Sequence, residues 1–85
     1  MRQFSYVITA PNGIHAVPAT TLAQETGKYT SFVSITKGPL ETDMSKPFKV
    51  MAMSINQGDT VVVSIEGDDE ELAARELEAF FQRCL

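Results

Sequence analysis

The chain contains a single cysteine, Cys84, a single histidine, His15, and no tryptophan. One cysteine excludes an internal disulfide, and with one histidine it supplies too few ligands for the usual zinc site, so no metal is expected. The apolar runs are too short to span a membrane or to form the core of a signal peptide, which leads us to expect a cytoplasmic protein. No basic patch suited to nucleic acid is present.

Acidic residues outnumber basic ones by eleven to seven, which gives a net charge of −4. They are unevenly spread: between Met1 and Leu40 the only acidic residue is Glu25, whereas most of the others follow Asp59. The N-terminal half is therefore free to face a negatively charged ligand. A length of 85 residues makes one small domain, 1–85, in which any chemistry has to take place at the surface.

Periodicity and turn residues predict seven elements in the order β-α-β-β-α-β-α. The expected strands span 4–9, 31–37, 40–44 and 60–65, and the expected helices span 16–28, 47–54 and the segment from Asp68 to the C-terminus. Ser45 is expected to cap the second helix, and Asp68 with Glu71 forms a capping-box pattern at the start of the third. Short strands interleaved with amphipathic helices predict an α+β fold, with a sheet covered by helices on one face. The stripe expected to face the sheet on the last helix comprises Leu72, Ala73, Leu77, Phe80 and Cys84.

His15 is placed at or just before the first residue of the helix expected at 16–28. The backbone N–H groups of Ala16 and Val17 have no partner inside such a helix, and its N-terminal end is positive, so an anion held beside His15 would meet both groups. The positive end also disfavours the imidazolium form, which keeps the ring neutral and nucleophilic. This pattern indicates an acceptor for a phosphoryl group. The alternative is an ordinary solvated histidine that caps the helix.

The residues around His15 also carry a resemblance to a known family. The stretches "ITAPNG", "NGIHAVPA", "PFKVMAM" and "QGDTVVVSIEGDDEE" closely resemble HPr, the histidine-containing phosphocarrier protein of the bacterial phosphoenolpyruvate:sugar phosphotransferase system. The resemblance covers essentially the whole chain. It implies an open-faced sandwich, βαββαβα, in which three helices cover one face of a four-stranded antiparallel sheet.

For function, the resemblance implies that His15 receives a phosphoryl group at Nδ1 from phospho-enzyme I. The group would then pass to the enzyme II A domains of sugar permeases. Such a protein is a carrier rather than a turnover enzyme, and it uses no cofactor of its own. We expect it to act as a monomer.

Two positions depart from the family pattern. Val17 stands where the family has an arginine that pairs with phosphate and with acidic partners, so transfer is expected to be slower or tuned to another partner, unless Lys46 or Lys49 supplies the charge. Lys46 also stands where many relatives carry a regulatory serine. Because Ser45 lies one residue earlier, we do not expect regulation by serine phosphorylation.

The resemblance further implies a docking surface for the phosphate donor and acceptors. An adaptable surface with a methionine and an aromatic suits a carrier with several partners, although apolar residues on short helices more often belong to the core. Two other functions remain open: a regulatory paralogue that binds a transcription factor or an enzyme with weak or lost phosphotransfer, and a ferredoxin-like binding module without phosphate chemistry. The implied surface consists of Val17, Thr20, Gln24, Gly27, Pro47, Phe48 and Met51.

Overall fold

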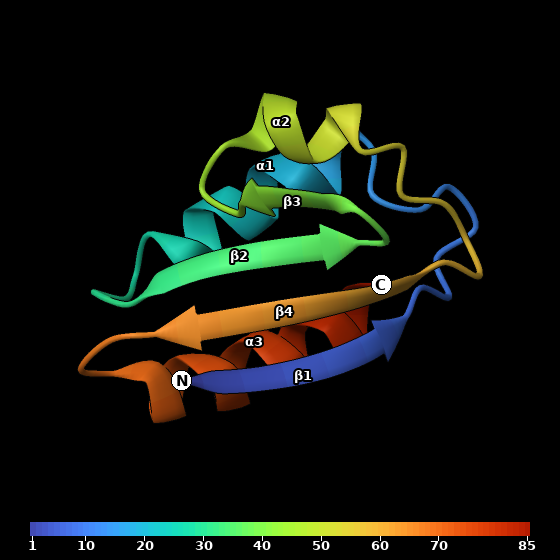
Figure 1. Cartoon of the computed structure of the whole chain (residues 1–85). Helices are drawn as coiled ribbons and strands as arrows, with labels where there is room; N and C mark the ends of the chain where they lie inside the picture. Colours follow the sequence, from blue (N-terminus) through green and yellow to red (C-terminus); the bar gives the residue numbers. More distant parts are fainter.

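Four strands form one antiparallel sheet in the order β1-β4-β2-β3, and three helices lie against one of its faces (Figure 1). A computed structural model describes all 85 residues. The predicted fold class and element order are confirmed. The elements are β1 (Arg2–Val7), α1 (Ala16–Thr26), β2 (Phe32–Lys37), β3 (Leu40–Asp43), α2 (Pro47–Ala52), β4 (Thr60–Glu66) and α3 (Glu70–Cys84).

The central strand β4 explains why the helices gather on one side of the sheet. Its alternate residues Val61, Val63 and Ile65 are fully buried, whereas the intervening Val62 and Ser64 are only partly covered. In a strand, successive side chains point to opposite faces, so one face supplies the core and the other stays open. The core thus lies between the sheet and the three helices. Its largest fully buried side chains include Phe81, Ile8, Leu22, Ile35, Met44, Ile55 and Leu77.

The start of α2 differs from the prediction. Lys46, not Ser45, is the residue before the helix, and it makes no side-chain cap. The backbone N–H and the hydroxyl of Ser45 both donate to one carboxylate oxygen of Asp43, at 2.9 and 2.7 Å. The Ser45 side chain is therefore used in the turn between β3 and α2, because its hydroxyl donates to a carboxylate and so forms a charge-assisted hydrogen bond there.

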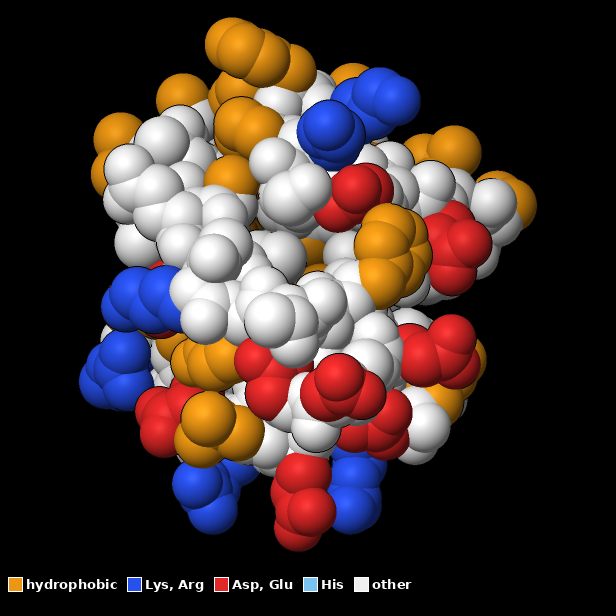
Figure 2. Space-filling view, turned by 90° about the vertical axis from the view of Figure 1, so that its left-hand side faces the viewer, with side chains coloured by type: hydrophobic (Ala, Val, Ile, Leu, Met, Phe, Trp, Pro, Cys, Tyr) orange, Lys and Arg blue, Asp and Glu red, His pale blue; other side chains and the backbone are white.

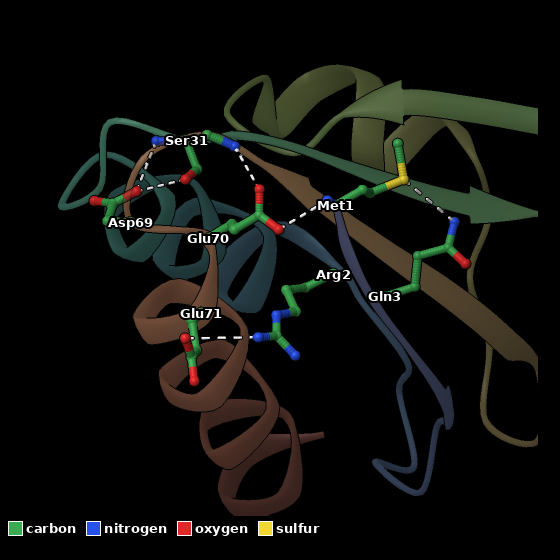
Figure 3. A network of polar contacts seen from close by, with 8 residues as sticks. Met1, Arg2, Gln3, Ser31, Asp69, Glu70 and Glu71 are labelled. Carbon is green, nitrogen blue, oxygen red and sulfur yellow. Dashed lines mark hydrogen bonds and ion pairs between the residues drawn. The ribbon is translucent and has the colours of Figure 1, made fainter.

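The start of α3 also differs, since the helix begins at Glu70 and Asp68 does not cap it. Asp69 precedes the helix, but its carboxylate turns away and accepts hydrogen bonds from the N–H groups of Thr30 and Ser31 and from the Ser31 hydroxyl (Figure 3). Glu70 accepts the N–H of Gly67 at 3.2 Å. A carboxylate does reach back by three residues, but it is that of Glu70 and not that of Glu71.

The face that α3 buries is rotated from the expected stripe. Ala73, Leu77 and Phe80 are buried as expected, and Phe81 joins them. The ring of Phe81 packs edge-on against Phe4 and Tyr6 of β1, with centroids 5.4 and 5.6 Å apart. Leu72 and Cys84 lie at the edges of this stripe and are exposed. The edge strand β1 therefore sets the rotation of the helix through its aromatic side chains.

The charge asymmetry of the sequence has a counterpart in space. The acidic residues 68–71 lie at the end of the sheet where β1 begins, and acidic side chains gather on this face in Figure 2. The loops that follow β1 and α2 lie at the other end (Figure 1). No helix has both the length and the apolar character to cross a membrane.

Candidate functional site

His15 lies where the sequence predicts it, immediately before α1. Its backbone is extended, its side chain is exposed and makes no capping hydrogen bond. The first hydrogen bond within the helix runs from the N–H of Ala19 to the carbonyl oxygen of His15, at 3.0 Å. The N–H groups of Ala16 and Val17 consequently have no partner inside the helix, and Pro18 has no N–H to offer. An anion beside the imidazole would meet two free donors.

The segment before His15 is fixed by the loop that follows α2. The N–H of Ile14 donates to the carbonyl oxygen of Ile55 at 3.0 Å, and both side chains are buried. Gly13 has a positive φ of 63°, and a Cβ atom there would lie 2.1 Å from the same carbonyl oxygen. Only glycine fits this close approach. Two segments distant in the sequence thus fix the backbone next to His15, and Figure 1 shows them side by side.

A hollow of about 330 Å³ opens beside His15. Its walls come from residues 10–13, from the first turns of α1 and from the end of α3, including Phe80 and Cys84. The backbone oxygen of Leu85 accepts the N–H of Ala10 at 2.8 Å and the Thr9 hydroxyl at 3.0 Å, which joins the end of the chain to this wall. No charged side chain lines the hollow. A phosphate next to His15 would therefore be stabilised by backbone donors and not by a neighbouring cation.

This hollow is the part of the site that sequence reasoning missed. Phe80 and Cys84 carry no local signal for it, because they approach His15 only through the packing of α3 on β1. The "APNG" stretch contains the nearest signal, since a glycine forced into a tight turn often marks a close approach of two backbones. Nowhere do three or more His, Cys, Asp or Glu side chains form a group able to hold a metal ion.

The structure places only some residues of the implied docking surface on an exposed face of α1 and α2. Helices α1 and α2 pack on each other, and Val17 and Phe48 remain 69 % and 81 % exposed. Thr20, Gln24 and Gly27 are exposed along α1. Pro47 is half-buried, and Met51 is partly covered because it packs against the core. The exposed apolar residues are therefore Val17 and Phe48, with Met51 contributing only an edge.

The candidates for charge compensation are Lys46, directly before α2, and Lys49, within it, and both are exposed. Both act on Asp43, whose carboxyl pKa lies below its usual value. Burial opposes this shift, while the hydrogen bonds from Ser45 and the two ammonium groups favour the carboxylate. Neither lysine lines the hollow beside His15.

The comparisons with known proteins agree on one family. The family model described as the "PTS HPr component phosphorylation site" matches residues 2–83. A phosphocarrier protein HPr from Buchnera aphidicola subsp. Acyrthosiphon pisum is 35 % identical over 77 residues, which is 91 % of each chain.

Solved structures show the same similarity in three dimensions. HPr from Thermoanaerobacter tengcongensis superposes with a TM-score of 0.91 at 29 % identity, covering 96 % of this chain and 92 % of that one. The catabolite-repression protein Crh of Bacillus subtilis, described as a swapped and intertwined dimer, gives a TM-score of 0.78 at 26 % identity, covering 98 % and 95 %.

Proposed function

Because the chain belongs to the HPr family of phosphocarrier proteins, we propose that it carries a phosphoryl group on His15 in the cytoplasm. Phospho-enzyme I is the proposed donor, and the enzyme II A domains of sugar permeases are the proposed acceptors. The protein acts as a monomer. It passes the phosphoryl group on to an acceptor in each cycle, so it is a carrier and not a turnover enzyme. The observation that carries this proposal is the exposed imidazole beside two backbone donors without helical partners.

The chemistry follows from this placement. The lone pair on Nδ1 of neutral His15 attacks phosphorus, and a nitrogen–phosphorus bond forms while the bond between phosphorus and the donor breaks. The electron pair of the broken bond returns to the donor, and the ring keeps its proton on Nε2. The N–H groups of Ala16 and Val17 donate hydrogen bonds to the phosphate oxygens, with the positive end of α1 behind them. The reverse step delivers the group to the acceptor.

The docking surface proposed for both partners spans the exposed faces of α1 and α2. Phe48 is its apolar anchor, since an exposed aromatic side chain has much area to bury in a complex. Lys46 and Lys49 flank it and suit a partner with acidic residues around an apolar pocket. In this arrangement Lys46 and Lys49, and not position 17, supply the positive charge that faces an acidic partner.

A second function is favoured by Val17 itself. A regulatory paralogue that binds a transcription factor or an enzyme through the same surface needs the apolar contact but not fast phosphoryl transfer. Val17 presents an exposed aliphatic side chain where a phosphate-binding guanidinium is expected. We favour the phosphocarrier over the regulatory paralogue because of His15. A purely regulatory protein has no need for an exposed histidine beside two free backbone N–H groups.

The test is incubation with enzyme I and phosphoenolpyruvate, followed by intact mass. The expected result is the gain of one phosphate that is labile in acid and stable in base, as for a phosphohistidine. His15→Ala should abolish the gain while keeping the thermal stability, because the side chain is exposed and makes no hydrogen bond. Ser5→Ala, an exposed position on β1 outside the docking surface, is the matched control and should be phosphorylated. Uptake by His15→Ala equal to wild type would contradict the proposal.

A further inference from the structure

A lysine at the end of β2 binds both ends of the loop between α2 and β4. Lys37 is the last residue of β2, and its side chain is only 28 % exposed. Its Nζ lies 2.7 Å from the carbonyl oxygen of Ser54, 3.4 Å from that of Met53 and 3.0 Å from a carboxylate oxygen of Asp59. One ammonium group thus joins the C-terminal end of α2 to the start of β4.

The loop that Lys37 holds is not in a relaxed conformation. Ser54 is the only residue other than glycine with a positive φ, 53°. Left-handed backbone is unfavourable for a residue with a Cβ atom and persists only where its surroundings enforce it. Lys37 supplies that enforcement, because its shortest hydrogen bond goes to the carbonyl oxygen of Ser54 itself.

The other end of the same loop is tied by Asp59. The carboxylate oxygen that receives Lys37 also accepts the N–H of Asn56 at 2.8 Å. These two contacts hold the pKa of the Asp59 carboxyl below its usual value, the bond from Asn56 being the larger cause. The side-chain amide of Asn56 in turn donates to Ser54, at 3.0 Å. The five residues 54–58 are therefore closed into a ring of polar contacts.

The carbonyl oxygen of Ile55, in the middle of this ring, is the one that receives the N–H of Ile14 next to His15. The backbone of 55–56 is also the surface against which Gly13 packs without room for a Cβ atom. A displacement of the loop must therefore move Gly13 and Ile14, and with them the start of α1. We propose that Lys37 is a positioning residue for His15, acting through the loop 54–58.

This inference rests on the proposed function, because positioning matters for a reaction at His15. Removing the ammonium group should lower the rate of transfer without weakening the docking surface, since Lys37 lies outside it. A displacement of the order of 1 Å at a reacting group is enough to cost about a hundredfold in rate, so a partial loss of the loop geometry is expected to cost about fivefold or more.

The test compares Lys37→Met with Lys28→Met, which breaks an ion pair of the same 3.0 Å length with Glu25 at the far end of α1. We expect Lys37→Met to lower the maximal rate of phosphorylation by enzyme I about fivefold, with KM within about twofold of wild type. Lys28→Met should change neither. Lys37→Arg should regain at least half of the lost rate, because a guanidinium can also donate to the carbonyl oxygen of Ser54 and to the carboxylate of Asp59.

Three results would overturn the inference: equal rates for Lys37→Met and Lys28→Met, a loss confined to KM, or no recovery in Lys37→Arg. Should Lys37→Met fail to fold, Lys37→Gln, which keeps a neutral donor, takes its place in the same comparison. Amide NMR of the unphosphorylated proteins gives an independent decision. The Ile14 amide and His15 ring signals should move in Lys37→Met and not in Lys28→Met, and equal shifts would overturn the inference even if the wild type takes up no phosphate and the proposed function fails.

Discussion

The N–H of Ile14 donates to the carbonyl oxygen of Ile55 at 3.0 Å, across 41 residues of sequence, and so fixes the position of the residue next to the only histidine. The same carbonyl oxygen leaves no space for a side chain on Gly13. The residue proposed to carry the phosphoryl group is thus placed by a backbone contact that any bulkier residue at position 13 would break.

Gly13→Ala is expected to destabilise the fold and to displace His15. A methyl group at position 13 clashes with the Ile55 oxygen and is also strained by the positive φ. In Gly38→Ala, at a φ of 57° with no neighbour within 4 Å, only the backbone strain applies. The difference in the free energy of unfolding between the two variants should be about 1 kcal/mol or more. Urea denaturation measures it, and equal losses for the two variants would contradict the steric argument.

Phe48→Ala should weaken docking to enzyme I by about 2 kcal/mol while changing the free energy of unfolding by less than about 0.5 kcal/mol. The ring is almost fully exposed in the free protein, and we expect it to become buried only in the proposed complex. Leu72→Ala on α3 removes an exposed apolar side chain outside the docking surface, and it should leave the affinity unchanged. Titration calorimetry and thermal unfolding give both quantities. A large drop in stability with unchanged affinity would assign Phe48 to the core.

Val17→Arg should speed the phosphorylation of His15 by about threefold to tenfold, because a charge-assisted hydrogen bond to phosphate replaces a backbone donor alone. The gain should shrink between low salt and 0.1 M salt, where exposed charges are screened within about 10 Å. Leu72→Arg adds the same charge on α3 and should have little effect on the rate.

Transfer rates at two salt concentrations, with the native and a heterologous enzyme I, decide between the two functions proposed above. An arginine that impairs the native partner and helps only the heterologous enzyme would favour the regulatory paralogue. If none of the four rates changes, position 17 does not lie on the path of the phosphate.

Asp69 should make the fold sensitive to acid. Its carboxyl pKa is lowered, first by the hydrogen bond from the Ser31 hydroxyl and then by the N–H of Thr30. A carboxyl whose pKa is lower in the folded chain stabilises the fold above its unfolded pKa of about 3.9, and this contribution is lost as the pH falls through the lower folded value.

We therefore expect Asp69→Asn to lower Tm at neutral pH and to show a smaller fall of Tm than wild type between about pH 6 and pH 3, because the amide does not titrate. Asp68→Asn is the matched control, since Asp68 has no hydrogen-bond or ion-pair partner in the structure and the variant should follow wild type at every pH. Thermal unfolding across this range is the measurement. A wild-type pH dependence in Asp69→Asn would show that its carboxylate is not the stabilising group.

The placement of His15 could be predicted because its signals are local. Asn12-Gly13 marks a turn, and Pro18 fits the first turn of a helix, so the histidine between them has to lie at the helix start. The exposure of Val17 and Phe48, by contrast, was expected from the resemblance to the family and not from a local pattern. The signals for His15 depend on residues within a few positions of each other, and tertiary contacts did not change them.

The errors have the opposite origin. Ser45 and Asp68 have the right chemistry for helix caps. The hydroxyl of Ser45, however, donates to Asp43. Asp69 binds Ser31, and α3 begins only after it, at Glu70, which leaves Asp68 outside the cap position. Likewise, the hollow beside His15 needs Phe80, which reaches it from the other end of the chain. Each depends on a partner that only the folded chain brings near, and no periodicity in the sequence carries that information.

The acidic start of α3 lies far from the hollow beside His15, which no Asp, Glu, Lys or Arg side chain lines, and this separation has a consequence for how the proposed partners meet the molecule. The proposed phosphorylated donor is negative and repels the acidic end of the molecule more than the end that carries the hollow, so its electric field exerts a torque on the freely tumbling protein. The torque turns the imidazole toward the phosphate before the surfaces touch. With screening over about 8 Å in physiological salt, it acts only during the last part of the approach. A negative net charge on average slows the encounter with a negative partner. Because the negative charge here is concentrated away from His15, it also raises the share of collisions that arrive in the reactive orientation.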